Sequence, residues 1–375
     1  MGKENELTPE IFAGFIADFC SRSPLASGRN LFWTIIANPK AGGFTIKSRR
    51  RKNYEQLLRC ANRVSGSQPK SGTGPSVTAA KENSNGLILT KRKGNAETIT
   101  AELIREASDS ANTGPLITEP LYLIVTAGGD GTSLEVLSTL FNAPAAILSR
   151  FAVLRLPMGT GNDGADAFEL EEALRLIIDP SEIIFQRVIR LFTSTPGKGP
   201  FPAFNILSVG LDAFVTHMTN KMKGKLPGDF YKLWVDIASL FYDKIYKVDT
   251  LAVHALDDAG NEVKSFKEKI LLLAVGESGH RCYGSQKHIL PDDRNVCAIR
   301  QMPMLKKIQF KELFATGGHV SKPEAILFNA SRVELSYGSS ILAQMDGESV
   351  LLEPADFPAA IELTKPIIPI LRLKS

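Results

Sequence analysis

Cysteine is scarce in this sequence, and its four cysteines stand far apart, at Cys20, Cys60, Cys282 and Cys297. Metal sites and disulfide frameworks need cysteines in close pairs or at regular spacings, and neither pattern is present. We therefore expect reduced thiols and a cytoplasmic location. Two common nucleotide-binding patterns are also missing: the phosphate-binding loop that ends in Lys-Ser or Lys-Thr, and the Gly-x-Gly-x-x-Gly turn of dinucleotide-binding folds.

Long apolar runs are absent as well. No stretch approaches the roughly 20 uncharged apolar residues of a membrane-spanning helix. Residues 1–10 carry acidic side chains where a secretory signal would need an apolar core, and Glu6 stands where a myristoylation signal would need Ser or Thr. A substrate within a membrane would therefore have to be reached from outside the bilayer.

Neither sign of charge is in large excess, because the formal net charge is +4 and the pI is near 8.7. This balance is too mild for a nucleic-acid-binding protein, so we expect no nucleic-acid partner, but it is compatible with a nucleotide or an anionic membrane. Basic residues gather at 47–52 and 91–93. Such runs are usually solvated helix faces. The alternative is that 47–52, with Lys221, Lys223 and Lys225, faces lipid headgroups.

The length of 375 residues and the 43% hydrophobic content predict two folded domains. After a helix that begins at Thr8-Pro9-Glu10, strands alternate with helices in the first part of the chain. The strands are expected at 31–37, 87–90, 121–126 and 151–156, and the helices at 54–64, 96–107 and 133–141. This alternation is typical of an open, mostly parallel α/β domain.

After Asp163 the pattern changes to one dominated by strands. They are expected at 183–192, 203–209, 247–256, 263–275, 332–336 and 341–344, with helices at only 215–223 and 230–243. We therefore predict an α/β domain followed by a β-rich domain, for which a β-sandwich is the expected architecture. The Gly-, Ser- and Pro-rich segment 65–86 is expected to be a loop.

Three glycine-bearing loops follow three of the expected strands of the first domain. They are Asn38-Pro39-Lys40-Ala41-Gly42-Gly43, Gly128-Gly129-Asp130-Gly131-Thr132 and Pro157-Met158-Gly159-Thr160-Gly161-Asn162-Asp163. In open parallel sheets, ligands bind outside the carboxyl ends of the strands. Glycines let backbone N–H groups approach a polyphosphate, and Thr132 opens a helix whose N-terminus favours an anion. One such loop would be an ordinary tight turn, but three converging loops predict a nucleotide-phosphate site.

Two acidic residues stand in these loops, Asp130 and Asp163. A carboxylate beside phosphate would repel it. Asp130 makes chemical sense if it holds Mg²⁺, directly or through water, or acts on a substrate proton, and Asp163 is a further polar ligand. The sequence therefore predicts Mg²⁺ together with the nucleotide.

The three blocks resemble the catalytic domain of the diacylglycerol kinase family, which includes bacterial lipid kinases and, more distantly, sphingosine and ceramide kinases. The resemblance runs from about residue 30 to 372 and includes Asn205-x-x-Ser208-x-Gly210-x-Asp212-Ala213 and Asp346-Gly347-Glu348. It implies a fold like that of NAD kinase and diacylglycerol kinase, with ATP in a cleft between an α/β domain and a β-sandwich. The expected boundaries are a helical extension at 1–28, the α/β domain at 29–162 and 350–375, and the lipid-substrate β-sandwich at 163–349.

The resemblance also assigns roles to residues. ATP or its Mg²⁺ would be bound by Asn38, Pro39, Gly42, Gly128, Gly129, Asp130, Gly131, Thr132, Gly159, Thr160, Gly161 and Asn162, with Asp130 and Asp163 as metal ligands. Asp346 would be the general base, with Glu348 and Asp212 in the same acidic pocket. Taken alone, Asp346-Gly347 is also a favourable hairpin turn, and Asp212 a helix cap.

The resemblance implies transfer of the ATP γ-phosphate to a lipid hydroxyl, chiefly that of diacylglycerol. It also implies peripheral association with a membrane, and it leaves open whether the protein is a homodimer. The alternatives are a sphingoid-base kinase, which usually has serine at the position of Thr160, a NAD kinase and an inactive relative. A NAD kinase would need an Asn-Glu pair for adenosine, and the pairs here lie in a terminus and a hairpin.

Family members often have Tyr-Gly-Gly-Gly and an acidic-glycine turn in the second domain. This chain has Tyr283-Gly284-Ser285-Gln286 and Pro291-Asp292-Asp293-Arg294-Asn295 there. The difference leaves open the identity of the acceptor and the presence of a structural divalent ion.

Overall fold

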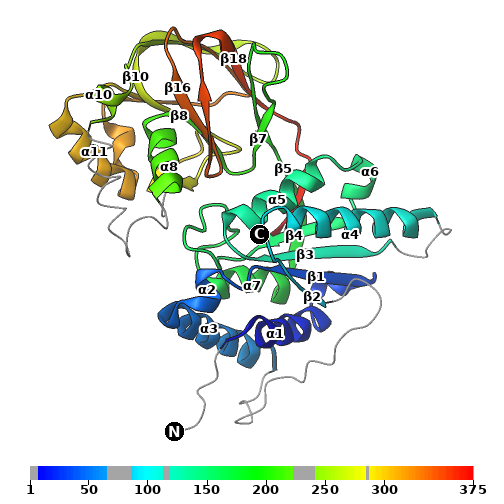
Figure 1. Cartoon of the computed structure of the whole chain (residues 1–375). Helices are drawn as coiled ribbons and strands as arrows, with labels where there is room; N and C mark the ends of the chain where they lie inside the picture. Colours follow the sequence, from blue (N-terminus) through cyan, green and yellow to red (C-terminus); the bar gives the residue numbers. More distant parts are fainter. Residues whose placement is uncertain (1–6, 66–85, 113–118, 223–240, 284–286, 375) are drawn as a thin grey trace. The chain divides into compact units, whose positions relative to one another are not determined.

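The computed structural model describes residues 7–65, 86–112, 119–222, 241–283 and 287–374. The chain divides into two compact units (Figure 1). Unit 1 comprises Met1–Gln186 together with Ile367–Ser375, and unit 2 comprises Arg187–Pro366. Two expected segments fall wholly or largely outside the described residues: the loop at 65–86 and the helix at 230–243.

Unit 1 is built on a six-stranded sheet with the order β2-β1-β3-β4-β19-β5. Its strands are β1 (Leu31–Ala37), β2 (Gly86–Leu89), β3 (Leu121–Ala127), β4 (Phe151–Arg155), β5 (Ser181–Gln186) and β19 (Ile368–Leu373). Every neighbouring pair is parallel except β19 and β5. Helices cover both faces of the sheet (Figure 1), and all residues of β3 and β4 are buried. The predicted open, mostly parallel α/β domain is confirmed.

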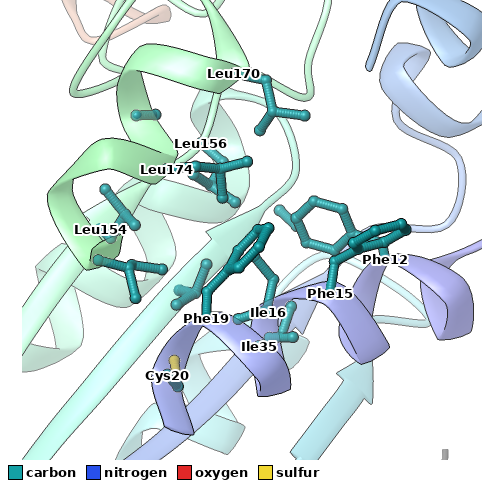
Figure 2. Close-up of a cluster of buried hydrophobic side chains, with 14 of the residues drawn as sticks. Phe12, Phe15, Ile16, Phe19, Cys20, Ile35, Leu154, Leu156, Leu170 and Leu174 are labelled. Carbon is teal, nitrogen blue, oxygen red and sulfur yellow. The ribbon is translucent and has the colours of Figure 1, made fainter. Parts of the chain in front are cut away.

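The N-terminal helix is part of the unit 1 core. The helices of this unit are α1 (Pro9–Ser21), α2 (Gly42–Thr45), α3 (Lys47–Ser65), α4 (Asn95–Asn112), α5 (Asp130–Phe141), α6 (Ala145–Leu148) and α7 (Leu170–Ile178). The Thr8 hydroxyl caps α1 by accepting the Ile11 N–H. Figure 2 shows Phe12 and Phe19 of α1 beside Leu174 of α7 and side chains of the sheet, in one apolar cluster. The described part of the expected extension, residues 7–28, therefore belongs to unit 1 and is not separate from it.

The boundaries of the two units differ from those expected from the sequence. The first unit continues past 162 to Gln186, because α7 packs on its core and β5 pairs with β19. The expected strand at 183–192 is two strands, β5 and β6 (Ile189–Phe192), one in each unit. The chain returns to unit 1 at Ile367 rather than at 350, because β17 (Glu348–Leu352) and β18 (Ala359–Leu363) pair within unit 2.

Unit 2 is an antiparallel β unit. Besides β6, β17 and β18, its strands are β7 (Phe201–Ala203), β8 (Ile206–Gly210), β9 (Thr250–Leu256), β10 (Glu262–Gly276), β11 (Arg281–Tyr283), β12 (Lys287–Leu290), β13 (Val296–Arg300), β14 (Ala325–Phe328), β15 (Arg332–Ser336) and β16 (Ile341–Met345). The long strand β10 joins the two halves of an 11-stranded sheet: its first part pairs with β9, its second with β8 and β13. Side chains from both halves, such as Leu191 and Leu273, share one core. The β-rich domain is confirmed; its strands form the 11-stranded sheet and a separate two-stranded sheet of β11 and β12.

The helices of unit 2 lie between strands. They are α8 (Leu211–Met222), α10 (Tyr242–Ile245) and α11 (Met304–Thr316), with short 3₁₀ turns at Gly318–Ser321 and Pro354–Asp356 and, in unit 1, at Pro24–Ala26. The helix expected at 215–223 is α8, which begins four residues earlier. The sequence analysis did not predict α11. No helix in the described part of the chain is long and apolar enough to span a bilayer.

Candidate active site

The three glycine-bearing loops of unit 1 lie at one edge of its sheet. They follow β1, β3 and β4, which are adjacent and parallel. The pairing continues into the loops: the Asn38 N–H donates to the Ala127 carbonyl and the Leu156 N–H to the Thr126 carbonyl, each at 3.0 Å. Because β2 lies on one side of β1 and β3 on the other, the strand order reverses between β1 and β3, where such sheets bind ligands.

The second and third loops are in direct contact. A Cβ on Gly159 would lie 2.4 Å from the Gly129 Cα, so the two backbones touch at a point where no side chain fits. The Asp130 carboxylate accepts the N–H groups of Asn162 and Gly164, each at 3.1 Å. Asn162 has a φ of 63°, a left-handed conformation that asparagine tolerates better than most residues. Backbone contact and hydrogen bonds therefore hold the second and third loops together.

The first loop joins the same structure. The Gly43 N–H donates to the Met158 carbonyl at 2.8 Å. A guanidinium nitrogen of Arg49, Nη1, donates to the Gly159 carbonyl at 2.7 Å, and a Cβ on Gly42 would lie 3.6 Å from the Thr160 hydroxyl oxygen. All three loops therefore meet, as the sequence predicted, and Arg49 is a member that it missed. The basic run at 47–52 gave a signal, but its spacing could not show that one residue turns inward.

Helix α5 supplies an anion-favouring end at this junction. It begins at Asp130 after Gly129, an N-cap residue without a side chain, so no side chain caps the helix there. The N-terminus of a 12-residue helix carries unsatisfied N–H groups and the positive end of its dipole. Gly128 must be glycine for Thr132 to sit there, because a Cβ would lie 2.4 Å from the threonine hydroxyl.

A fourth loop reaches the same edge of the sheet. The Glu135 carboxylate accepts the N–H groups of Gly94 at 2.8 Å and Ala96 at 3.1 Å, at the start of α4. The Thr90 N–H donates to the Ala37 carbonyl at 2.8 Å, which extends the β2–β1 pairing beyond β2. The exposed basic residues 91–93 follow directly. The basic run was noted from the sequence, but nothing in the sequence connected it with Glu135.

The two carboxylates expected to bind Mg²⁺ are close together. The Oδ2 atoms of Asp130 and Asp163 would lie 2.9 and 3.8 Å from a Cβ on Gly161. Carboxylate oxygens have more than one acceptor position, so those of Asp130 can accept an N–H and still face a cation. Mg²⁺ is usually bound through one or two carboxylates plus phosphate and water. The pair fits such a shared ion; within the described residues no cluster of three or more acidic, His or Cys side chains could hold a metal.

Asp346 occupies the turn between β16 and β17 in unit 2. Its φ of 47° and that of 96° at Gly347 are those of a tight hairpin turn. Its carboxylate accepts the backbone N–H groups of Phe204, Asn205 and Ile206, with Oδ1 at 3.1 Å from the Asn205 nitrogen and 2.9 Å from the Ile206 nitrogen. Asp346 therefore anchors the hairpin to the connection between β7 and β8.

Asp212 lies in a buried polar cluster near the same hairpin. Its carboxylate accepts from the Ser208 hydroxyl and, at 3.1 Å, from the Gln344 amide nitrogen. The oxygen of that amide accepts the Gly347 N–H at 3.0 Å. Ser208, Asp212 and Gln344 are all buried, whereas Glu348, on the far side of the turn, is exposed. Unit 2 thus brings the two later sequence blocks together at the turn between β16 and β17.

The turn at 291–295, which departs from the family pattern, contains an ion pair between Arg294 and Asp292. Arg294 donates to the Asp292 carboxylate through Nε, at 3.0 Å from Oδ1 and 3.2 Å from Oδ2. This hydrogen-bonded guanidinium lowers the pKa of Asp292 against a smaller opposing effect of burial. A cation of the chain itself therefore holds this turn, and residues 284–286 beside it lie outside the described structure.

Comparisons with known proteins agree with this site. The family model described as the diacylglycerol kinase catalytic domain matches residues 33–190, which contain all three loops. The resemblance expected from the sequence is confirmed over residues 33–190, which are similar to the catalytic domain of the diacylglycerol kinase family.

Solved structures show the same fold. Two crystal structures of a candidate diacylglycerol kinase from Bacillus anthracis strain Sterne are similar to this chain at 17% sequence identity, with TM-scores of 0.53 and 0.52. Each likeness covers 90% of this chain and 96% of the other. At this identity the likeness shows the fold alone: a parallel α/β unit followed by an antiparallel β unit.

Proposed function

We propose that the protein transfers the γ-phosphate of ATP to the hydroxyl of a lipid, with diacylglycerol as acceptor and phosphatidic acid as product. The observation that supports this best is the meeting of three glycine-bearing loops at the N-terminus of α5, with Thr160 and Arg49 at the same junction. A family match alone would not identify a working site, but a match whose loops converge supports one.

The nucleotide end of the reaction belongs to unit 1. Phosphoryl transfer depends mainly on positioning and on neutralising charge, because its transition state is loose. Gly129 and Gly159 let the second and third loops meet, and α5 directs the positive end of its dipole toward the proposed phosphate position. Asp130 and Asp163 would hold Mg²⁺, which when bound neutralises phosphate charge. The two N–H bonds to Asp130 fix that carboxylate beside the third loop.

The acceptor end of the proposal uses the acidic residues of unit 2. Asp346 is proposed as the general base, with Glu348 and Asp212 beside it. An aspartate needs to take the alcohol proton only as the oxygen bonds to phosphorus, so an ordinary carboxylate suffices. Three backbone N–H groups keep the Asp346 carboxylate in place. Because Glu348 is exposed on the same turn, separate substitutions are needed to divide the roles between them.

The decisive experiment measures transfer of labelled γ-phosphate from ATP with Mg²⁺ to a panel of diacylglycerol, sphingosine, ceramide and NAD⁺. We expect labelled phosphatidic acid. A labelled sphingoid base or labelled NADP⁺ as the main product would replace the proposed acceptor. No product from any acceptor, with MgATP still bound in a direct binding assay, would identify an inactive relative and contradict the proposal.

Substitution of single carboxylates tests the assigned roles. Asp130→Asn, Asp346→Asn and Glu348→Gln should each be compared with Asp293→Asn, whose side chain is 97% exposed and lies outside both groups. Loss of a general base typically lowers turnover by about 100-fold or more, so we expect such a loss for Asp346→Asn and a comparable one for Asp130→Asn. Circular dichroism should show an intact fold. Wild-type turnover in both would reject the assignments.

A further inference from the structure

Exposed apolar side chains are concentrated in one part of unit 2. Among the described residues, 13 large hydrophobic side chains are exposed, and five of them lie on or beside α10 and α11. These five are Phe241, Ile245, Met304, Leu305 and Ile308, of which Leu305 is the most exposed at 75%. We call these five residues the α10–α11 patch. Single exposed apolar residues need no explanation, but a cluster usually marks a site of interaction.

An ion pair holds the two helices of the patch together. The Asp243 carboxylate of α10 lies 3.1 Å from the Lys307 ammonium of α11 and accepts a hydrogen bond, also at 3.1 Å, from the Gln301 amide just before α11. Lys307 is buried, so this contact lies beneath the surface. Figure 1 shows α10 and α11 at the same end of unit 2. The exposed residues on both helices are therefore neighbours.

Helix α11 has two apolar faces. Phe310 and Phe314 are four positions apart and point into the core of unit 2. Met304, Leu305 and Ile308 have the three- and four-residue spacing of a second stripe, on another side of the helix, and this stripe is exposed. A helix that needed only to cover the core would carry polar residues there. The exposed apolar face of α11 therefore indicates contact with an apolar partner.

Two exposed lysines lie beside the patch. Within 241–249 and 304–316 the chain has five lysines and three acidic residues. Lys247, Lys306 and Lys307 pair with carboxylates of the protein. Lys244 and Lys311 are exposed beside the patch. The basic run 47–52, the other candidate for headgroup contact, is partly used within unit 1: Arg49 donates to Gly159, and Lys52 pairs with Glu169. Apolar residues with a basic rim are complementary to an anionic bilayer surface.

We propose that the α10–α11 patch docks on an anionic lipid bilayer, with Leu305, Ile308 and their apolar neighbours among the acyl chains and Lys244 and Lys311 at the headgroups. The inference deepens the proposed function, because an enzyme that phosphorylates a membrane lipid must reach the bilayer. Its physical basis, however, is the exposed apolar face and its lysines, and it is tested without any phosphorylation.

The test measures co-sedimentation of the full-length protein with vesicles of phosphatidylcholine containing phosphatidylglycerol, in the absence of ATP. We expect Leu305→Gln/Ile308→Gln to weaken binding at least tenfold. Val263→Gln, which replaces an exposed apolar residue of β10 outside the patch, should bind like the wild type. Lys244→Gln/Lys311→Gln should weaken binding only when phosphatidylglycerol is present and should reduce its salt dependence. Thermal unfolding checks that each variant folds.

The outcomes that overturn the proposal are distinct from failure of the proposed function. Absence of vesicle binding by the wild type, or equal binding by the Leu305/Ile308 variant, would refute the docking surface. A wild-type dimer that this variant converts to a monomer would instead identify the patch as a contact between copies of the chain. Phosphorylation of a dispersed short-chain diacylglycerol reports the enzyme separately: if it fails while patch-dependent vesicle binding persists, only the proposed function is wrong.

Discussion

At the scale of single residues, the candidate site depends on backbones that touch. Gly159 lies so close to Gly129 that a Cβ would stand 2.4 Å from the Gly129 Cα, and a backbone atom cannot move away as a flexible side chain could. The loop that carries Thr160 can therefore meet the loop that opens α5 only if residue 159 is glycine. Local strain at this position would spread into the proposed phosphate site.

We expect Gly159→Ala to lower the affinity for MgATP at least tenfold, because the second and third loops must separate. Overpacking of this kind also costs about 1–3 kcal/mol of stability. Gly86→Ala is the control, since a Cβ there meets nothing within 4 Å. Calorimetric titration with a non-hydrolysable ATP analogue measures the difference, and equal affinities in the two variants would contradict the described contact.

A second residue-scale feature is the buried pair of Arg155 and Asp166. Asp166 accepts from Arg155 at 2.7 Å and from Arg372 at 3.0 Å, and its side chain is fully buried. Burial alone would raise the pKa of Asp166, but the two guanidinium groups outweigh it and the pKa is lowered. A lowered carboxyl pKa stabilises the fold above the ordinary value of about 3.9, and this stability is lost as the pH falls through the folded pKa.

Asp166→Asn should therefore destabilise unit 1 at neutral pH. Breaking a buried pair leaves a guanidinium without its counter-charge and typically costs about 3–5 kcal/mol. Asp258→Asn, which removes the 70%-exposed partner of Arg187, should have little effect. Urea unfolding at pH 7 compares the two, and similar midpoints would show that the buried pair is not important for stability.

At the scale of elements, the end of α11 contains a pH-sensitive contact. His319 follows α11, is buried, and its ring lies 4.7 Å from that of Phe314. Burial lowers the pKa of His319, although the hydrogen bond to the Ile289 carbonyl opposes this. The folded state therefore binds the proton less well than the unfolded state. Stability is full above the unfolded pKa of about 6.5 and falls as the pH drops from there toward the folded pKa.

His319→Gln should remove this loss. We expect the unfolding temperature of the wild type to fall between pH 7 and pH 5 more steeply than that of the variant, which is less stable at pH 7 but less sensitive to acid. Thermal unfolding across this range measures both slopes. Parallel curves would show that His319 does not titrate with folding.

At the scale of the whole molecule, the last strand completes the first unit. β19 lies between β4 and β5, so the α/β unit is assembled from segments at both ends of the chain. Ile370 is 1% exposed in the middle of this strand, whereas Leu373, near its end, is 38% exposed. The two residues are large and aliphatic and differ chiefly in burial.

Ile370→Ala should lower the stability of unit 1 by about 2–5 kcal/mol, the usual cost of truncating a buried aliphatic side chain. Leu373→Ala should lower it clearly less. Limited proteolysis can follow the two units separately, and we expect Ile370→Ala to expose sites in unit 1 before unit 2. Equal resistance in both variants would mean that β19 is dispensable for the unit.

The sequence by itself determined the strands and loops that depend on residues close together in the chain. The continuous apolar run of β3, the glycines around Asp130 and Thr132, and the cap at Thr8 act over a few residues, and each lies where the sequence placed it. The later block at Asp346-Gly347 is a hairpin turn, as local chemistry favours. The roles of these residues in binding and catalysis stay predictions.

Only the tertiary structure decided which distant segments pair. Residues 163–186 belong to unit 1 because β5 bonds to β19, a strand about 180 residues later, and no local pattern encodes that partner. Arg49 turns toward Gly159, and the Asp346 carboxylate binds three N–H groups of the β7–β8 connection, for the same reason. Propensity and capping act between near neighbours, whereas sheet pairing, burial and ion pairs depend on what the folded chain brings into contact.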